Sequence, residues 1–266
     1  MRTPCGLRFD SERPGDAQLL QPNGEGGELE AMSSTISSEK RRAGALAELK
    51  PDAKAGAADI PECCLTTRPR SYIRIKRIAD IILAAIGLVI TMPLWGLIAL
   101  AIKLSSTGPV FFRQERPGKG MAPFGILKFR TMVQDAESRL AEVIDVDDTE
   151  DPLIRVKDDP RVTGVGHLLR VTSLDELPQL LNVLRGEMSM VGPRPISRPI
   201  LDPRNRVRLQ VTPGITGLWQ VSGRKDADTN YMLEKDMEYL EKRSFLFDVQ
   251  ILLKTVLAVI RADGAR

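Results

Sequence analysis

Two adjacent carboxylates, Asp175 and Glu176, are the residues of this sequence whose type and setting could do chemistry. Their segment has the pattern of a helix start, with Ser173 as a potential N-cap, Glu176 three residues later and Pro178 in the first turn. Acidic side chains in a first turn complement the helix dipole, and that is the simpler interpretation of the pair. The catalytic interpretation is that the dipole keeps Asp175 ionised, because an ionised aspartate can attack phosphorus or bind a divalent cation.

Arginine residues surround this acidic pair in the sequence. They are Arg161 and Arg170 before the pair, Arg194 within the segment Val191–Pro195, and then Arg198, Arg204, Arg206 and Arg208. A guanidinium on a segment stiffened by glycine and proline is suited to binding phosphate. A single exposed arginine is usually only a solvated charge, but this density beside a membrane element indicates an anionic substrate at a membrane surface.

Several common nucleotide-binding and metal-binding motifs are absent from the sequence. It contains neither a Gly-x-x-x-x-Gly-Lys-Ser/Thr phosphate loop nor a Gly-x-Gly-x-x-Gly turn, so a nucleotide would be recognised in another way. The only histidine, His167, excludes a multi-histidine zinc site. Cys5, Cys63 and Cys64 lack metal-ligand spacing, and we expect free thiols in a reducing compartment. A formal charge of +3 gives no global preference for nucleic acid.

An apolar run is the element that would bring such a site to a membrane. The 22 residues from Ile81 to Ile102 carry no charge. At about 1.5 Å per residue, a helix of this length could cross a hydrocarbon core about 30 Å thick. A buried helix of a soluble protein is the alternative. Pro93, near the middle of the run, removes a backbone hydrogen bond and predicts a kink or a break.

Basic residues flank the apolar run on both sides. They are Arg68, Arg70, Arg74, Lys76 and Arg77 before it, and Lys103, Arg113, Arg116 and Lys119 after it. Positive charge marks the cytoplasmic side of a membrane segment. Cations at both ends therefore favour a helix that enters the membrane, turns and returns, with a kinked single span as the alternative.

The chain divides by composition into three parts. Residues 1–70 contain too little apolar bulk to form a core and predict a flexible polar tail. Residues 71–104 form the membrane-inserted part, and residues 105–266 form a folded domain.

Within the folded domain, a few segments have clear secondary-structure patterns. Gly108–Arg113 and Phe124–Phe129 predict two short strands joined as a hairpin. The helix that follows Ser173 is expected to end at Arg185-Gly186. The segment from Tyr239 to Ile260 is either a core helix or a helix in the lipid headgroup layer.

Seven motifs in this order resemble those of the bacterial polyprenyl-phosphate phosphoglycosyl transferases, the initiating sugar transferases of exopolysaccharide and other surface glycans. They are Lys76-Arg77-x-x-Asp80, Gly108–Arg116, Lys128–Met132, Asp159–Thr163, Thr172–Leu180, Val191–Pro195 and Pro213–Gly217. The match covers about residues 71–260 and resembles the short exopolysaccharide-initiating members, because only the polar tail precedes it.

The resemblance implies an α+β monotopic enzyme of the inner, cytoplasmic membrane. Its N-terminal helix would be broken and re-entrant, and amphipathic helices would hold the catalytic domain, residues 105–266, at the cytoplasmic face. Such enzymes commonly carry a Ser-Pro pair at the break, whereas this chain has Met92-Pro93, so Thr91 would supply the hydroxyl.

The resemblance also implies a reaction. A sugar 1-phosphate would pass from a UDP-sugar to undecaprenyl phosphate, with Asp175 as the nucleophile, UMP as the product and Glu176 helping Asp175 to hold Mg²⁺. The phosphate-binding arginine of the family matches Arg194. Four further cations match motif positions and are expected to bind substrate: Lys128, Arg130, Arg161 and Arg113. A homo-oligomer and downstream glycosyltransferases are possible partners, and nucleic acid is not expected.

Two other classes of function compete with this one. The first is a membrane-tethered scaffold that keeps the fold without catalysis, which the intact Asp175-Glu176 pair and Arg194 disfavour. The second is an anchored regulator whose arginine-rich segment binds anionic lipid or nucleic acid, which leaves Thr172–Leu180 unexplained. Release of UMP from a UDP-sugar distinguishes the transferase from both.

Overall fold

The computed structural model describes residues 68–139, 159–196, 205–222 and 229–260, all within the unit Asp59–Arg266. Helices and short strands are mixed along this part of the chain, in agreement with the expected α+β class. The predicted polar tail, apart from its last three residues, lies outside the described residues.

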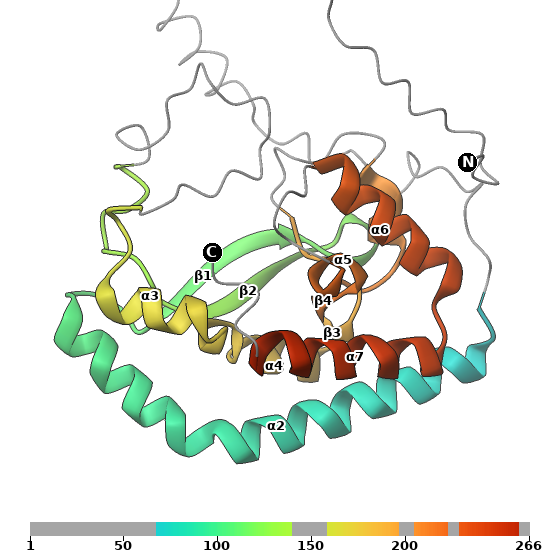
Figure 1. Ribbon diagram of the computed structural model, residues 1–266, viewed down its shortest axis with the longest axis horizontal. Helices are drawn as coiled ribbons and strands as arrows, with labels where there is room; N and C mark the ends of the chain where they lie inside the picture. Colours follow the sequence, from blue (N-terminus) through green and yellow to red (C-terminus); the bar gives the residue numbers. More distant parts are fainter. Residues whose placement is uncertain (1–67, 140–158, 197–204, 223–228, 261–266) are drawn as a thin grey trace, which may run out of the picture. The chain divides into compact units, whose positions relative to one another are not determined.

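Helix α2, Arg70–Ser105, contains the whole apolar run and continues through Pro93. Figure 1 shows it as one curved ribbon, so the predicted kink takes the form of a bend in an unbroken helix. The Thr91 hydroxyl donates to the Gly87 carbonyl oxygen at 2.7 Å and accepts from Trp95 Nε1 at 3.2 Å. The first bond precedes Pro93 and the second spans it, and the ring nitrogen of Pro93 has no hydrogen to donate.

Helix α2 is long and apolar enough to cross a membrane, and only 11% of its most apolar stretch is buried. A core helix of a soluble protein would be mostly buried, so the exposure of α2 disfavours that alternative. The buried residues of the helix are Asp80, Ala84, Ile98 and Ile102, two on each side of Pro93. Large hydrophobic side chains cover the exposed remainder, among them Ile82, Ile86, Val89, Ile90, Leu97, Leu100 and Leu104.

The predicted hairpin is confirmed. Strand β1, Phe111–Pro117, pairs with strand β2, Pro123–Phe129, in antiparallel register from Phe111 opposite Phe129 to Pro117 opposite Pro123. The short 3₁₀ turn η3, Lys119–Met121, joins the two strands. Phe111 and Phe129 stack on each other and both contact the Trp95 ring, which fixes the hairpin on the second half of α2.

Helix α3, Gly164–Val171, begins at Thr163, whose hydroxyl accepts a hydrogen bond from the Gly166 amide. Gly166 packs directly on the backbone that follows β2, because a Cβ at this position would lie 1.9 Å from the Thr131 carbonyl oxygen. The 3₁₀ turn η5, Leu174–Glu176, and helix α4, Gln179–Arg185, come next. Helix α4 ends as predicted, with Gly186 in the left-handed region at φ 86°.

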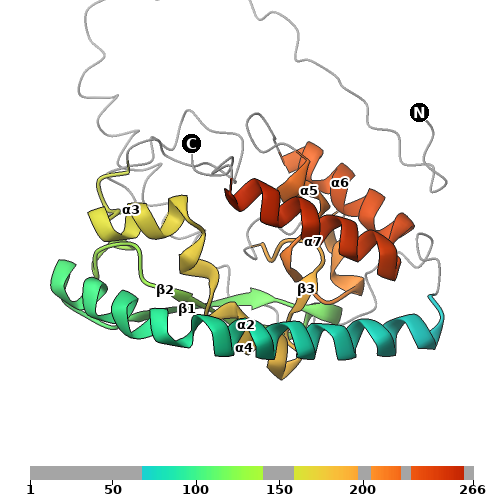
Figure 2. The same ribbon diagram turned by 60° about the horizontal axis from the view of Figure 1, so that its bottom comes forward.

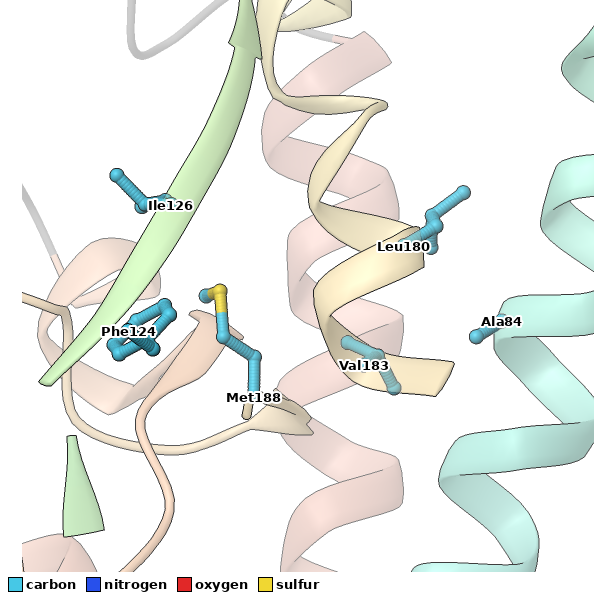
Figure 3. Packing of buried hydrophobic residues seen from close by; sticks show 6 residues of the cluster. All are labelled: Ala84, Phe124, Ile126, Leu180, Val183 and Met188. Atoms are coloured by element: carbon cyan, nitrogen blue, oxygen red, sulfur yellow. The ribbon is translucent and has the colours of Figure 1, made fainter. Parts of the chain in front are cut away.

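Helix α4 is the centre of the core. Figure 3 shows Ala84 of α2 facing Leu180 and Val183 on one side of α4, while Phe124 and Ile126 of β2 lie with Met188 on the other. All six side chains are buried. Helix α2 is thereby integrated into the folded domain rather than tethered to it.

The C-terminal part begins with a small parallel pair of strands, β3, Ser189–Val191, and β4, Gly214–Thr216. Around this pair lie the 3₁₀ helix η7, Asn205–Gln210, and helices α5, Leu218–Val221, α6, Thr229–Lys242, and α7, Phe245–Ile260. Helices α6 and α7 both pack against α5, and α7 also contacts β3, as Figure 2 shows.

Helix α7 has one buried face and one exposed apolar face. Its inner face buries Ile251 and Asp248. Its other face exposes large apolar side chains: Phe245, Leu246, Leu253, Val256 and Leu257. Helix α7 also runs beside the first half of α2, as both ribbon views show.

Two of the basic residues that flank the apolar run are used inside the fold. Lys76 Nζ donates to Asp248 Oδ2 and to the Val191 carbonyl oxygen, each at 3.0 Å. The Arg77 guanidinium donates to the carbonyl oxygens of Val183 and Leu184, at the end of α4. These two cations join α2 to the domain, a role that the interpretation of their charge as a marker of membrane orientation did not include.

Candidate active site

Asp175 and Glu176 lie in the turn η5, between α3 and α4. The helix start predicted for this segment is wrong in detail, because α4 begins only at Gln179 and the Ser173 side chain makes no capping hydrogen bond. Ser173 instead adopts a left-handed conformation, with φ 57°. This tight turn, rather than a first helical turn, presents the two carboxylates.

Lys128, near the end of β2, lies beside both carboxylates. Its Nζ is 3.0 Å from Glu176 Oε1 and 4.0 Å from Asp175 Oδ2. The wholly buried Asn182 of α4 fixes this strand, since its Oδ1 accepts from the Leu127 amide at 3.1 Å and its Nδ2 donates to the Gly125 carbonyl oxygen at 2.8 Å. Asn182 thus fixes the position of Lys128 beside the acidic pair.

Arg194, in the segment that follows β3, also lies beside the acidic pair. Its Nη2 lies 3.7 Å from Glu176 Oε1, and its guanidinium carbon lies 5.9 Å from the centre of the Trp219 ring. Gly192, two residues earlier, packs against the chain before β4, where a Cβ would lie 2.6 Å from the Thr212 carbonyl oxygen. The Gly-Pro-Arg segment is therefore held closely against its neighbour.

Burial controls the protonation of Asp175. The side chain is only 12% exposed, and this loss of hydration raises the pKa of Asp175 above its ordinary value. The neighbouring charge of Glu176 raises the same pKa. Lys128, Arg170 and Arg194 act in the opposite direction. Asp175 lies in the 3₁₀ turn before α4 rather than in the first turn of that helix, and these three cations favour its ionised form.

The structure places the other predicted substrate-binding cations elsewhere. Arg130 donates to the backbone and hydroxyl oxygens of Ser106, just after α2, and Arg161 forms a buried ion pair with Asp159. Arg113 lies over Gly125 within the hairpin, where its Nε would be 2.1 Å from an added Cβ. The described contacts therefore bring Lys128 and Arg194 to the carboxylates and do not bring these three.

Two residues near the carboxylates were not among the predicted site residues. Arg170, at the end of α3, donates from Nε to the Thr131 hydroxyl at 3.0 Å and interacts electrostatically with Asp175. Its position five residues before Asp175 was the available signal. Trp219 forms a cation–π contact with Arg194, and the sequence contains no pattern that would have indicated this role.

The family model of the bacterial sugar transferases matches residues 71–262 of this chain. The chain belongs to the bacterial sugar transferase family. The resemblance that its motifs indicated is thereby confirmed, and the site around Asp175 lies within the matched region.

Several bacterial proteins share substantial identity with the chain. The exopolysaccharide production protein ExoY of Rhizobium meliloti is 40% identical over 213 residues, which cover 77% of this chain and 94% of ExoY. The UDP-glucose:undecaprenyl-phosphate glucose-1-phosphate transferase of Caulobacter vibrioides is 43% identical, with 71% of each chain covered. The undecaprenyl-phosphate galactose phosphotransferase of Salmonella typhimurium is 40% identical, over 74% of this chain and 42% of that protein.

The carboxylates of this sugar transferase also form the candidate metal site. Among the described residues, no cluster of three or more His, Cys, Asp or Glu side chains is suited to hold an ion. The pair Asp175-Glu176 fits Mg²⁺ nonetheless, because this ion is commonly held by one or two carboxylates and completes its shell with water and substrate phosphates.

Proposed function

We propose that this sugar transferase moves a hexose 1-phosphate from a UDP-sugar to undecaprenyl phosphate and releases UMP. The observation that carries the proposal is the grouping of a buried carboxylate, Asp175, with cations from three separate elements: Lys128, Arg170 and Arg194. A nucleophile surrounded by positive charge suits a diphosphate donor, since anion would otherwise repel anion.

In the first step, a carboxylate oxygen of Asp175 attacks the phosphorus next to the sugar. The bond from this phosphorus to the bridging oxygen breaks, and UMP leaves with the electron pair. An aspartyl phosphosugar remains on the protein. In the second step, an oxygen of the lipid phosphate attacks the same phosphorus and releases the Asp175 carboxylate. Two displacements by charged nucleophiles thus replace one.

Lys128 and Arg194 have complementary roles in these steps. Both contact Glu176, at 3.0 and 3.7 Å. Their side chains are each 24% exposed, so both can also meet a phosphate that enters from solvent. Mg²⁺ bound at Asp175 and Glu176 would neutralise charge on the diphosphate. The guanidinium of Arg194 can bind two phosphate oxygens at once, whereas Lys128 provides a compact charge.

A monotopic position at the cytoplasmic face of the inner membrane suits the arrangement of α2. Its buried residues Asp80 and Ala84 lie before Pro93, and Ile98 and Ile102 lie after it. Both halves of the helix pack on one folded domain, which favours having both ends on one side of the bilayer. Exposed apolar faces on α2 and α7 provide the contact with lipid that a polyprenyl acceptor needs.

The proposal is tested by incubating the purified full chain with Mg²⁺, undecaprenyl phosphate and either UDP-glucose or UDP-galactose, the two sugars that the relatives' names suggest. We expect UMP to be released with at least one donor. A scaffold or a lipid-binding regulator would release none.

The covalent step has its own test. A donor with labelled phosphate next to the sugar should label the wild-type protein when acceptor is absent, and undecaprenyl phosphate should then remove the label. Asp175→Asn should take up no label. If UMP appears only when donor and acceptor are both present and no label stays on the protein, direct transfer replaces the two-step reaction.

A further inference from the structure

A fully buried ion pair lies directly behind Arg194. The side chains of Arg208, in η7, and Asp236, in α6, are each 1% exposed and are bonded through Arg208 Nη2. The same Nη2 donates to the Arg194 carbonyl oxygen at 3.1 Å. Nη1 of Arg208 lies 3.7 Å from the Met232 sulfur. Arg208 thus joins α6 to the backbone of a proposed substrate-binding residue.

The pair is a poor source of net stability. Removing two charges from water has a large free-energy cost, which their mutual attraction often fails to offset. Here burial raises the pKa of Asp236 to about 6 although Arg208 is in contact with it. Loss of hydration therefore outweighs the attraction between the two charges, and the pair is better explained by the conformation that it imposes.

That conformation concerns the segment from Gly192 to Arg194. On one side, the Gly192 amide donates to the Thr216 carbonyl oxygen and the Gly214 amide donates to the Pro193 carbonyl oxygen, each at 2.9 Å. On the other side, Arg208 binds the next carbonyl, that of Arg194. The backbone is then fixed at successive residues, and the guanidinium of Arg194 projects over Trp219 toward Glu176.

We infer that Arg208 and Asp236 are positioning residues, which hold the Arg194 backbone so that its guanidinium is preset for the phosphates of the donor. The inference rests on the proposed function for its consequence in catalysis. Because the Arg208 side chain is 1% exposed, it acts through Arg194 and not by contact with substrate. Prior placement of a phosphate-binding group matters because misplacement by about 1 Å can lower a rate a hundredfold.

A double-mutant cycle tests the inference. In the full chain, Asp236→Asn keeps the size of the side chain and removes the charge that orients Arg208. We expect kcat/KM for the UDP-sugar to fall at least tenfold. In the Arg194→Ala background, the same change should lower kcat/KM less than twofold, because the residue through which it acts is gone. Equal losses in both backgrounds would refute the inference.

Two further variants separate positioning from folding. Asp159→Asn disrupts the other buried Arg–Asp pair, whose Arg161 also binds a backbone carbonyl, that of Ala136. It should lower the melting temperature and leave kcat/KM within twofold. If Asp236→Asn does not fold, Arg208→Lys replaces it in the cycle, because it keeps the charge and loses the fork that binds Asp236 and Arg194 together.

A second readout does not depend on activity. The chain has two tryptophans, so Trp95→Phe leaves Trp219 as the only one. In this background, Asp236→Asn should shift the Trp219 emission when Arg194 is present and leave it unchanged beside Arg194→Ala. If the wild type releases no UMP, the proposed function fails, and this emission cycle still decides whether the pair positions Arg194. Unchanged emission in both backgrounds would refute the positioning.

Discussion

Asp175 occupies a position where catalysis and stability have opposite requirements. The proposed attack on phosphorus needs an ionised carboxylate, yet the site buries the carboxyl group of Asp175 and so raises its pKa. Lys128, Arg170 and Arg194 favour the ionised form but come from separate elements that only the fold brings together. Ionisable groups whose burial lowers the stability of the fold are common in active sites, because catalysis needs a reactive charge out of water.

The first prediction is that Asp175→Asn raises the melting temperature while it abolishes UMP release. A group whose folded-state pKa is raised stabilises the fold fully below its unfolded-state pKa, and this contribution is lost as pH rises through the folded-state pKa. At neutral pH the ionised Asp175 therefore lowers stability, and a neutral amide of the same size removes the penalty. Thermal melts at neutral and acid pH check the prediction. The gain should disappear at acid pH, and a loss of stability at neutral pH would contradict it.

The second prediction concerns the pH dependence of the rate. In the proposed reaction only ionised Asp175 attacks, so kcat/KM should fall as pH falls through the pKa of Asp175, which burial raises above its ordinary value. Lys128 lowers this pKa, so Lys128→Met should move the acid limb of the profile to higher pH and reduce the maximum about tenfold or more. Initial rates of UMP release from low pH to neutral pH provide the measurement. An acid limb that stays in place would exclude this coupling.

Among the elements, α4 and α2 decide the geometry of the site. Helix α4 holds the hairpin through Asn182 and holds α2 through Leu180 and Val183 (Figure 3). By holding β2 in place, α4 keeps Lys128 beside the turn that carries Asp175 and Glu176. The curved α2 underlies this assembly and packs on it both before and after Pro93.

The third prediction tests the role of α4. Asn182→Ala should destabilise the fold by roughly 2–4 kcal/mol, because it removes the partners of the Gly125 carbonyl and the Leu127 amide. Chemical denaturation monitored by circular dichroism measures the change. Lys242→Ala, at an exposed position of α6, is the control and should alter stability by less than about 0.5 kcal/mol. Equal effects of the two changes would contradict the role given to Asn182.

The fourth prediction concerns the topology of α2. Ser71 and Thr107 are exposed and lie at its two ends. In a chain whose native cysteines are replaced by serine, Ser71→Cys and Thr107→Cys should both be labelled from the cytoplasmic side by a reagent that does not cross membranes. Both halves of α2 pack on the same domain, which is the reason for this expectation. Labelling from opposite sides would establish a single span.

At the scale of the whole molecule, the described part of the chain combines a polar catalytic site with extended apolar surface. The exposed large hydrophobic side chains lie mainly on α2 and α7. Apolar area of this kind holds a protein at a membrane by the hydrophobic effect, which salt does not screen. The seven matched motifs all fall within residues 76–217, so none lies in the polar tail.

The fifth prediction follows from this distribution. A chain that lacks residues 1–67 should retain UMP release within about twofold, and both forms should stay on vesicles in high salt and leave them in detergent. Activity assays and vesicle flotation provide the measurements. A loss of more than tenfold in a shortened chain that still reaches the membrane would show a role for the tail.

The sequence by itself determined the family, the long apolar helix, the hairpin and the acidic pair, because these depend on composition and on residues close together in the chain. It also identified Arg194, although only through the motif that carries it. The tertiary structure alone decided which cations reach Asp175. Lys128, Arg170 and Arg194 approach it from β2, α3 and the segment after β3, whereas Arg130 and Arg161, with equally clear motifs, contact Ser106 and Asp159. It also decided that Asp175 is buried and that Arg208 stands behind Arg194, because burial and long-range contacts depend on packing between distant segments, which local sequence does not encode.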